Sequence, residues 1–165
     1  MPARPSRLLL VCSLLAFAGS PLAAQGASDR DAVSAVLDAL HAKASEADFE
    51  GYFALYADEA VFLGTDATER WTREEFMTYT KARFDTGTGW TYHMVERHVS
   101  VAPDGQTAWF DERLHNDGLG ETRGSGVLVR EGEAWRIAQY NLTIPIPNDL
   151  ARDVVRQIRA ATGGP

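Results

Sequence analysis

Four strand-like segments in the second half of the chain constrain its fold most, because only short turns separate them. Pro103-Asp104-Gly105 joins the first two segments, and Glu131-Gly132-Glu133 joins the last two. Both turns are of the hairpin type, and strands joined by hairpins pair antiparallel. The sequence therefore predicts a four-stranded meander made of residues 90–101, 107–115, 122–130 and 135–144.

Helices are predicted before this meander. Apolar residues recur at spacings of three and four after Ser28, which predicts an amphipathic helix with Ser28 as its N-cap. A shorter helix begins at Asp48, and Thr72 with Glu75 has the capping-box pattern that opens a third. Asn148 is expected to cap a last helix. Helices followed by a meander predict an α+β domain with helices on one face of an antiparallel sheet.

The tight turn at residues 103–105 fixes which residues pair across the first hairpin. With Asp104 and Gly105 at the tip, Arg97 faces Glu112, and His93 lies on the same face. That face is the more apolar, so we expect it to meet the helices. A bulge near the turn would reverse this assignment.

Alternation along the last hairpin places Gln139 and Asn141 on the face of Trp135 and Ile137. If the two apolar residues are core, both amides point inward. Glycines on the same face would leave room for a cavity, namely Gly124 and Gly126. The opposite, outer face then gathers apolar side chains, which predicts a covered surface and most simply a homodimer. Its apolar members are Trp109, Val127, Val129, Tyr140 and Leu142.

Residues 1–24 have the pattern of a secretory signal peptide. A basic start with Arg4 and Arg7 precedes an apolar run, and Leu22-Ala23-Ala24 supplies small residues before the cleavage point. The run is shorter than the roughly 20 residues that a membrane span needs, so no span is expected in the mature protein. The sequence predicts one mature domain, residues 25–165, that is periplasmic or secreted.

Charge and composition narrow the function classes. Loss of the leader removes Arg4 and Arg7, which changes the net charge from −7 to −9. No basic stripe is visible, so no nucleic-acid partner is expected. Cys12 leaves with the leader, which excludes a thiol nucleophile or thiolate metal site. His93 and His98 point to opposite faces of one strand, and the sequence contains no metal, phosphate or dinucleotide motif. We therefore expect no metal and no cofactor.

Several local stretches carry a resemblance to a known family. They are Phe62–Glu69 with Trp71, Ala108–Phe110, Arg123–Val127, Trp135–Ile137 and Gln139–Asn148. Together with the order of elements, they resemble the SnoaL-like branch of the nuclear transport factor 2-like superfamily. The resemblance implies a cone-shaped α+β barrel, also called cystatin-like, with a deep pocket between helices and sheet and usually a dimer. Members include enzymes of several kinds and domains without activity, so the fold alone fixes no chemistry.

The ionisable candidates for a site are Glu112, Arg97 and His93. A carboxylate in apolar surroundings can act as a general base, and Arg97 and His93 would tune it. The alternative is a structural ion pair of Arg97 with Glu112, beside a histidine that is simply hydrogen-bonded.

The other candidates would bind a ligand. Gln139 and Asn141 could donate hydrogen bonds to a ligand oxygen, or satisfy strand ends or buried water. Trp71 could stack on a ligand at the pocket mouth, although the loop before it has ordinary turn and capping residues. Tyr56 and Phe53 could line the pocket, although aromatic residues at helical spacing are usually core.

Three functions remain open on the sequence alone. The first is an enzyme for isomerisation, dehydration or hydrolysis of a small apolar substrate, with Glu112 as base. The second is a non-catalytic module that binds an apolar small molecule, and the third is a dimeric interaction domain with a filled pocket. A cavity below about 300 Å³ would favour the third. A reachable Glu112 at the pocket floor would favour the first, and a Glu112 locked by Arg97 the second.

Overall fold

The computed structural model describes residues 21–163, with side chains from residue 28 onward. The predicted α+β class is confirmed, and the chain forms four helices and six strands in this range. In chain order they are α1 (Pro21–Glu46), α2 (Phe49–Phe53), β1 (Tyr56–Leu63), β2 (Arg70–Thr72), α3 (Arg73–Phe84), β3 (His93–Val101), β4 (Thr107–Asn116), β5 (Gly120–Glu131), β6 (Ala134–Thr143) and α4 (Asn148–Thr162). The predicted leader, residues 1–24, lies outside the described residues except for the start of α1.

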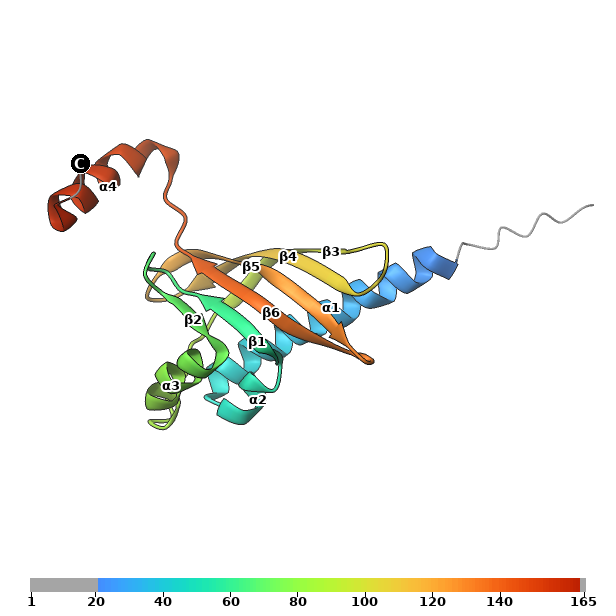
Figure 1. The fold of residues 1–165 in the computed structure, drawn as a ribbon. Coiled ribbons are helices and arrows are strands. Elements are labelled where there is room, and N and C mark those ends of the chain that lie inside the picture. The colour runs from blue at the N-terminus through green and yellow to red at the C-terminus, as the bar shows by residue number, and fades with distance from the viewer. Residues whose placement is uncertain (1–20, 164–165) are drawn as a thin grey trace, which may run out of the picture.

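One curved sheet carries the fold, in the order β2-β1-β6-β5-β4-β3. Each strand from β3 to β6 pairs antiparallel with the next one in the chain, as predicted. β1 pairs with β6 in parallel, so the sheet is mixed. The described strands leave β2 and β3 as edges, so the sheet curves without closing into a barrel. Figure 1 shows α1, α2 and α3 on one side of this sheet, while α4 projects away from the body.

The helix starts depend on local capping. Asp48 caps α2 by accepting a hydrogen bond from the Gly51 N–H, and Thr72 with Glu75 forms the predicted capping box of α3. Two predicted caps are wrong. Ser28 lies inside α1, which begins at Pro21, and Asn148 is the first residue of α4, which has Pro147 as an N-cap without a side-chain bond.

The core lies between the helices and the concave face of the sheet. The predicted stripe of α1 is buried there, since Val33, Leu37, Leu40 and Ala44 are at most 4% exposed. Aromatic side chains from α2, β1 and α3 continue this core toward one end of the sheet. They are Tyr52, Phe53, Tyr56, Phe76 and Phe84.

The first hairpin pairs as predicted next to its turn, with Val101 opposite Ala108 and Arg97 opposite Glu112. A bulge between Met94 and Glu96 then shifts the register by one residue. As a result His93 pairs with His115, which is exposed on the outer face. The prediction that His93 shares the face of Glu112 is therefore wrong, because one extra residue reverses the alternation.

A second bulge changes the last hairpin in the same way. Leu128 pairs with Ile137 and Val127 with Gln139, so Ala138 is the extra residue. Beyond it Gln139 and Asn141 fall on the outer face, whereas Tyr140 and Leu142 point into the core. The inward prediction for the two amides is wrong, and the outer face is less apolar than predicted.

Gly124 and Gly126 do lie on the inner face, but side chains fill the space above them. A Cβ on Gly124 would meet the Tyr140 hydroxyl and Glu112, and one on Gly126 would meet the Gln139 backbone and the Phe110 ring. The two glycines therefore allow inward side chains to approach the strand.

No helix in the described part of the chain combines the length and the apolar character needed to cross a membrane.

Candidate functional site

A cavity of about 620 Å³ opens between the helices and one end of the sheet. Its volume lies within the usual range of small-molecule sites. This size argues against an interaction domain with a filled pocket. Aromatic rings form much of its lining, among them Phe62, Trp71, Phe76, Tyr79, Trp90 and Tyr140.

Several of these rings lie nearly parallel to one another. Phe62 stacks on Phe76 with ring centroids 3.9 Å apart and planes 14° apart. Trp71 stacks on Tyr79 at 4.7 Å, and the planes of Tyr79 and Trp90 differ by only 8° at 6.2 Å. Stacked on one another in this way, the rings give the cavity a flat aromatic wall.

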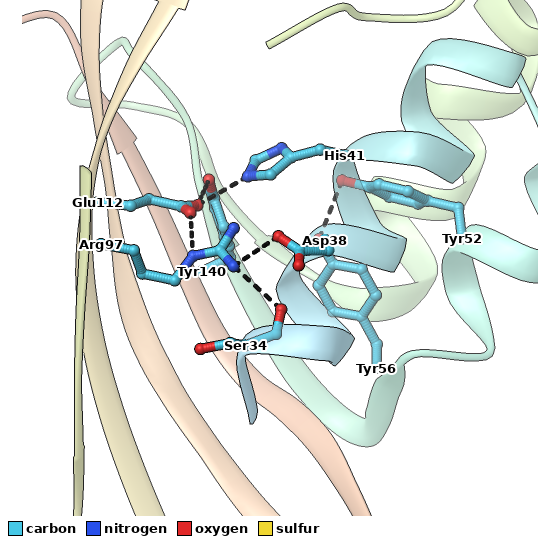
Figure 2. Close-up of polar contacts among 8 residues, drawn as sticks. All are labelled: Ser34, Asp38, His41, Tyr52, Tyr56, Arg97, Glu112 and Tyr140. Atoms are coloured by element: carbon cyan, nitrogen blue, oxygen red, sulfur yellow. Dashed lines mark hydrogen bonds and ion pairs between the residues drawn. The ribbon is translucent and has the colours of Figure 1, made fainter. Parts of the chain in front are cut away.

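Three side chains from distant parts of the chain meet at the inner end of the cavity. His41 on α1 places Nε2 2.9 Å from Glu112 Oε1, and the Tyr140 hydroxyl donates to the same oxygen at 2.9 Å. Figure 2 shows these contacts converging on the carboxylate of Glu112. His41 and Tyr140 line the cavity, whereas the Glu112 side chain is fully buried behind them.

Arg97 holds the other oxygen of Glu112. Its Nε donates to Glu112 Oε2 at 2.8 Å, which confirms the predicted pair. Its Nη1 donates to Asp38 Oδ1 at 2.7 Å and to the Ser34 carbonyl at 3.0 Å, both on α1 (Figure 2). The guanidinium thus ties β3 and β4 to the helix that carries His41.

The charge on Glu112 is maintained in spite of burial. Burial alone would raise the pKa of this carboxyl, but the hydrogen bonds and charges of His41 and Arg97 outweigh it and hold the pKa below its usual value. For Tyr140, burial and the negative charge of Glu112 both raise the pKa well above that of a free tyrosine. At neutral pH the cavity floor therefore holds the neutral phenol of Tyr140, and the Glu112 carboxylate lies directly behind it.

This arrangement fixes the proton positions on His41. An ionised carboxylate only accepts hydrogen bonds, so His41 Nε2 carries the hydrogen that points to Glu112. In the neutral form of the ring, Nδ1 therefore carries no hydrogen and is an acceptor. A histidine held in one tautomer by a buried carboxylate can take a proton from a substrate, and the carboxylate stabilises the imidazolium that forms.

A second polar pair lies next to this group. The hydroxyls of Tyr52 and Tyr56 are 3.0 Å apart and buried, and Tyr52 lines the cavity. Burial raises the pKa of both phenols, so both keep their protons at neutral pH.

The structure brings together only some of the predicted site residues. Trp71 lines the cavity, and Arg97 with Glu112 forms the polar group behind it. Glu112 does not reach the cavity, which differs from the expected position of a base. Phe53 and Tyr56 are core residues that do not line the cavity.

The remaining predicted residues lie away from the cavity. His93, Gln139 and Asn141 are on the outer face because of the two bulges. His41, Tyr140 and Tyr52 were missed. His41 follows Leu37 by four residues on the apolar stripe of α1, so its inward position could have been inferred. Tyr140 could not, since its direction depends on the bulge at Ala138.

No group of three or more His, Cys, Asp or Glu side chains within residues 21–163 is arranged to hold a metal ion.

Comparison with known proteins identifies the fold. Residues 33–147 match the SnoaL-like domain. Among solved structures, an NTF2-like protein of unknown function from Pseudomonas putida has 14% identity and a TM-score of 0.62, covering 74% of this chain and 91% of that one. A proposed dehydratase of the NTF2-like family from Streptomyces avermitilis has 16% identity and a TM-score of 0.61, covering 74% and 99%. A proposed aromatic ring hydroxylase from Novosphingobium aromaticivorans has 15% identity and a TM-score of 0.61, covering 73% and 92%.

These identities are low, so the similarity concerns the fold alone. Among curated proteins, none matches the chain.

Proposed function

The chain belongs to the SnoaL-like branch of the nuclear transport factor 2-like superfamily, as its sequence resemblance predicted, and from this premise we propose that it is a cofactor-independent acid–base enzyme. Its substrate is a small, flat, largely apolar molecule. The observation that carries the proposal is the cavity-lining His41, whose Nε2 is held 2.9 Å from the buried carboxylate of Glu112.

In this proposal His41 is the general base, and Glu112 is a positioning residue. His41 Nδ1 takes a proton from a carbon of the substrate, and the electron pair of the broken C–H bond enters the π system of the substrate. The same nitrogen returns the proton to another atom, which completes an isomerisation, or assists departure of a hydroxide as water in a dehydration. A positioned base of this kind contributes about 10²- to 10⁴-fold to the rate.

Proton abstraction can be tested with a probe ketone before the natural substrate is known. The probe is 2-tetralone, a flat aromatic ketone with exchangeable hydrogens next to its carbonyl group. Its loss of hydrogen signal in D₂O is followed by ¹H NMR. We expect saturable exchange with the wild-type protein and an at least 100-fold slower exchange with His41→Gln. His115→Gln is the matched control, because this histidine is exposed on the outer face.

Two results would refute the proposed base: exchange no faster than in buffer, or equal exchange by wild type and His41→Gln. Binding of the probe without exchange would instead support a non-catalytic ligand-binding module. One observation favours that alternative, since both oxygens of Glu112 already have protein partners and Arg97 locks one of them.

A homodimer through the outer sheet face is part of the proposal. Trp109 is 50% exposed on that face and pairs with Val127 across β4 and β5. The projecting α4 also exposes apolar side chains, Leu150, Val155 and Ile158. Sedimentation velocity should give a dimer for the wild type and a monomer for Trp109→Ser, with Leu119→Ser as a control at the cavity mouth. A wild-type monomer at micromolar concentration would rule the dimer out.

Export is likewise proposed, on the leader-like pattern of residues 1–24. Cleavage after Ala24 would remove Pro21–Ala24 from the first turn of α1. Expression of the full chain in a bacterium should place the protein outside the cytoplasm, with Gln25 as the first residue by N-terminal sequencing. Ala24→Arg should block the cleavage. An uncleaved wild-type chain in the cytoplasm would contradict the proposal.

A further inference from the structure

The guanidinium of Arg83 lines the cavity but takes no part in the polar group around Glu112. Arg83 is in the last turn of α3, and its side chain is exposed. Its Nε and Nη2 both donate to the Gly89 carbonyl, at 3.2 and 3.0 Å. Its Cζ lies 5.3 Å from the centre of the Trp90 ring, which is a cation–π contact. Three contacts therefore hold an exposed cation in one place at the cavity mouth.

The position of Gly89 is fixed in turn by the end of α1. The Trp90 N–H donates to the Ala44 carbonyl at 3.0 Å, and a Cβ at position 89 would collide with the same carbonyl. Glycine allows the chain to pass this close to the helix. The guanidinium of Arg83 is therefore tied, through Gly89, to a buried residue of the core.

Hydrogen-bond accounting shows what Arg83 offers to a ligand. A guanidinium has five N–H groups, and Gly89 uses one on Nε and one on Nη2. Nη1 and Nη2 each keep one N–H on the outer edge of the group. Among the described residues no carboxylate pairs with Arg83, whereas Lys81 in the same turn pairs with Asp85 at 2.9 Å. Two parallel N–H groups are thus available, and their spacing matches the two oxygens of a carboxylate.

The charge of Arg83 also acts inside the cavity. Burial raises the pKa of Tyr92, a cavity-lining residue, and the positive charge of Arg83 opposes this rise. The ring of Tyr92 lies 6.3 Å from the ring of His41, measured between centroids. The cation at the mouth is therefore felt on the side of the cavity that leads to His41.

Two neighbouring acids limit the charge that this place accepts. Glu69 and Asp117 also line the cavity. Glu69 accepts a hydrogen bond from the Asp66 N–H at 3.1 Å, and Asp117 Oδ1 lies 3.6 Å from His115 Nε2. Both carboxylates thus have partners other than Arg83. Their negative charges favour a ligand group with a single negative charge over a dianion such as a phosphate.

We propose that Arg83 binds a carboxylate of the ligand through Nη1 and Nη2, so that the natural ligand class is small, flat ring compounds that carry one carboxylate. The ligand ring lies against the aromatic wall, which includes Trp90, and its acid group lies at the cavity mouth. This inference rests on the proposed function only for the other end of the ligand, where the reacting C–H group faces His41. Arg83 is a binding residue and takes no part in the proton transfer.

The test compares two probes of the same shape, 2-naphthoate and 2-naphthamide, which differ only by O⁻ against NH₂. Dissociation constants are measured by equilibrium dialysis at pH 7. The wild-type protein should prefer the carboxylate. Arg83→Gln should reduce this preference about tenfold, the lower end of the effect of hydrogen bonds to a charged group, because Arg83 is exposed. Thermal unfolding checks that each variant is folded.

Lys81→Gln is the matched control. It removes the same charge from the same turn of α3, but Lys81 does not line the cavity, so the carboxylate preference should be kept. Arg83→Lys separates geometry from charge. It keeps the charge but loses the two parallel N–H groups, so we expect a preference between those of the wild type and Arg83→Gln.

Four results would overturn the inference: an unchanged preference in Arg83→Gln, an equal loss in Lys81→Gln, no measurable binding of either probe, or tighter binding of 2-naphthyl phosphate than of 2-naphthoate. The proposed base is tested separately, because dialysis measures binding alone. A carboxylate preference that depends on Arg83 without exchange of 2-tetralone would refute only the base. Exchange of 2-tetralone without a carboxylate preference would refute only the role of Arg83.

Discussion

Replacing Glu112 by glutamine tests the most distinctive feature of the site, an ionised carboxylate without solvent exposure. The carboxylate accepts hydrogen bonds at both oxygens, from His41 and Tyr140 on one and from Arg97 on the other. A carboxamide has one oxygen, so its NH₂ group must face a donor on one side. Moreover, Arg97, with a side chain only 5% exposed, would keep only the 65% exposed Asp38 as an ionic partner.

The expected loss follows from these contacts. Removal of one member of a buried ion pair lowers stability by about 3–5 kcal/mol. Glutamine keeps the shape and one acceptor, so we expect about 3 kcal/mol at pH 7. Urea unfolding followed by tryptophan fluorescence measures it. Asp111→Asn is the control, since this neighbouring side chain on β4 is exposed and should change stability by less than about 0.5 kcal/mol.

The pH dependence provides a second check. The folded protein lowers the pKa of Glu112 below its reference value of 4.5, so the stabilisation is fully present above that pH. It is lost as the pH falls through the folded-state pKa. The difference in stability between wild type and Glu112→Gln should therefore shrink as the pH falls below 4.5. A loss under about 1 kcal/mol at pH 7, or a difference that grows in acid, would contradict this account.

Two other substitutions test the local geometry. Gly124→Ala would place a methyl group against the Tyr140 hydroxyl and 2.8 Å from Glu112 Oε1. It should therefore weaken binding of the probe ketone and lower the midpoint of urea unfolding. The control is Gly132→Ala, which has open space around it, so its loss of stability should be limited to the modest strain of a positive φ. Thr72→Ala removes one half of the capping box of α3 and should lower the free energy of unfolding by about 1 kcal/mol in the same assay, while an unchanged value would mean that the cap is not needed.

The sequence predicted the parts of the fold that depend on local signals. Local signals predicted the capping box at Thr72 and Glu75, the apolar stripe of α1 and the hairpin turn at Asp104. Each of these features depends on residues that are only a few positions apart. The turn also fixed the pairing of Arg97 with Glu112, which lies only seven residues from the tip. These predictions hold because the turn sets the register directly.

Predictions failed where register had to be carried further along a strand. Because of the bulge between Met94 and Glu96, His93 points outward. Because of the bulge at Ala138, Tyr140 lies at the inner face where Gln139 was predicted. A bulge inserts one unpaired residue without a fixed composition, so alternation alone cannot locate it. Its effect is large, since every residue beyond it changes face. The pairing of β1 with β6 was also beyond local signals, because it joins strands far apart in the chain.

The polar network is better suited to orientation than to stability. Burying Glu112 and Arg97 requires both charges to be desolvated, and apolar residues of similar volume usually hold a helix to a sheet equally well or better. The network instead fixes atoms that apolar packing could not fix: the tautomer of His41, the direction of the Tyr140 hydroxyl and the position of α1 over β4. The cost of desolvating a charge also accounts for the position of Glu112 behind the residues that line the cavity. A carboxylate in contact with an apolar substrate would be desolvated further by binding, whereas here the proposed base, His41, lies between the carboxylate and the cavity.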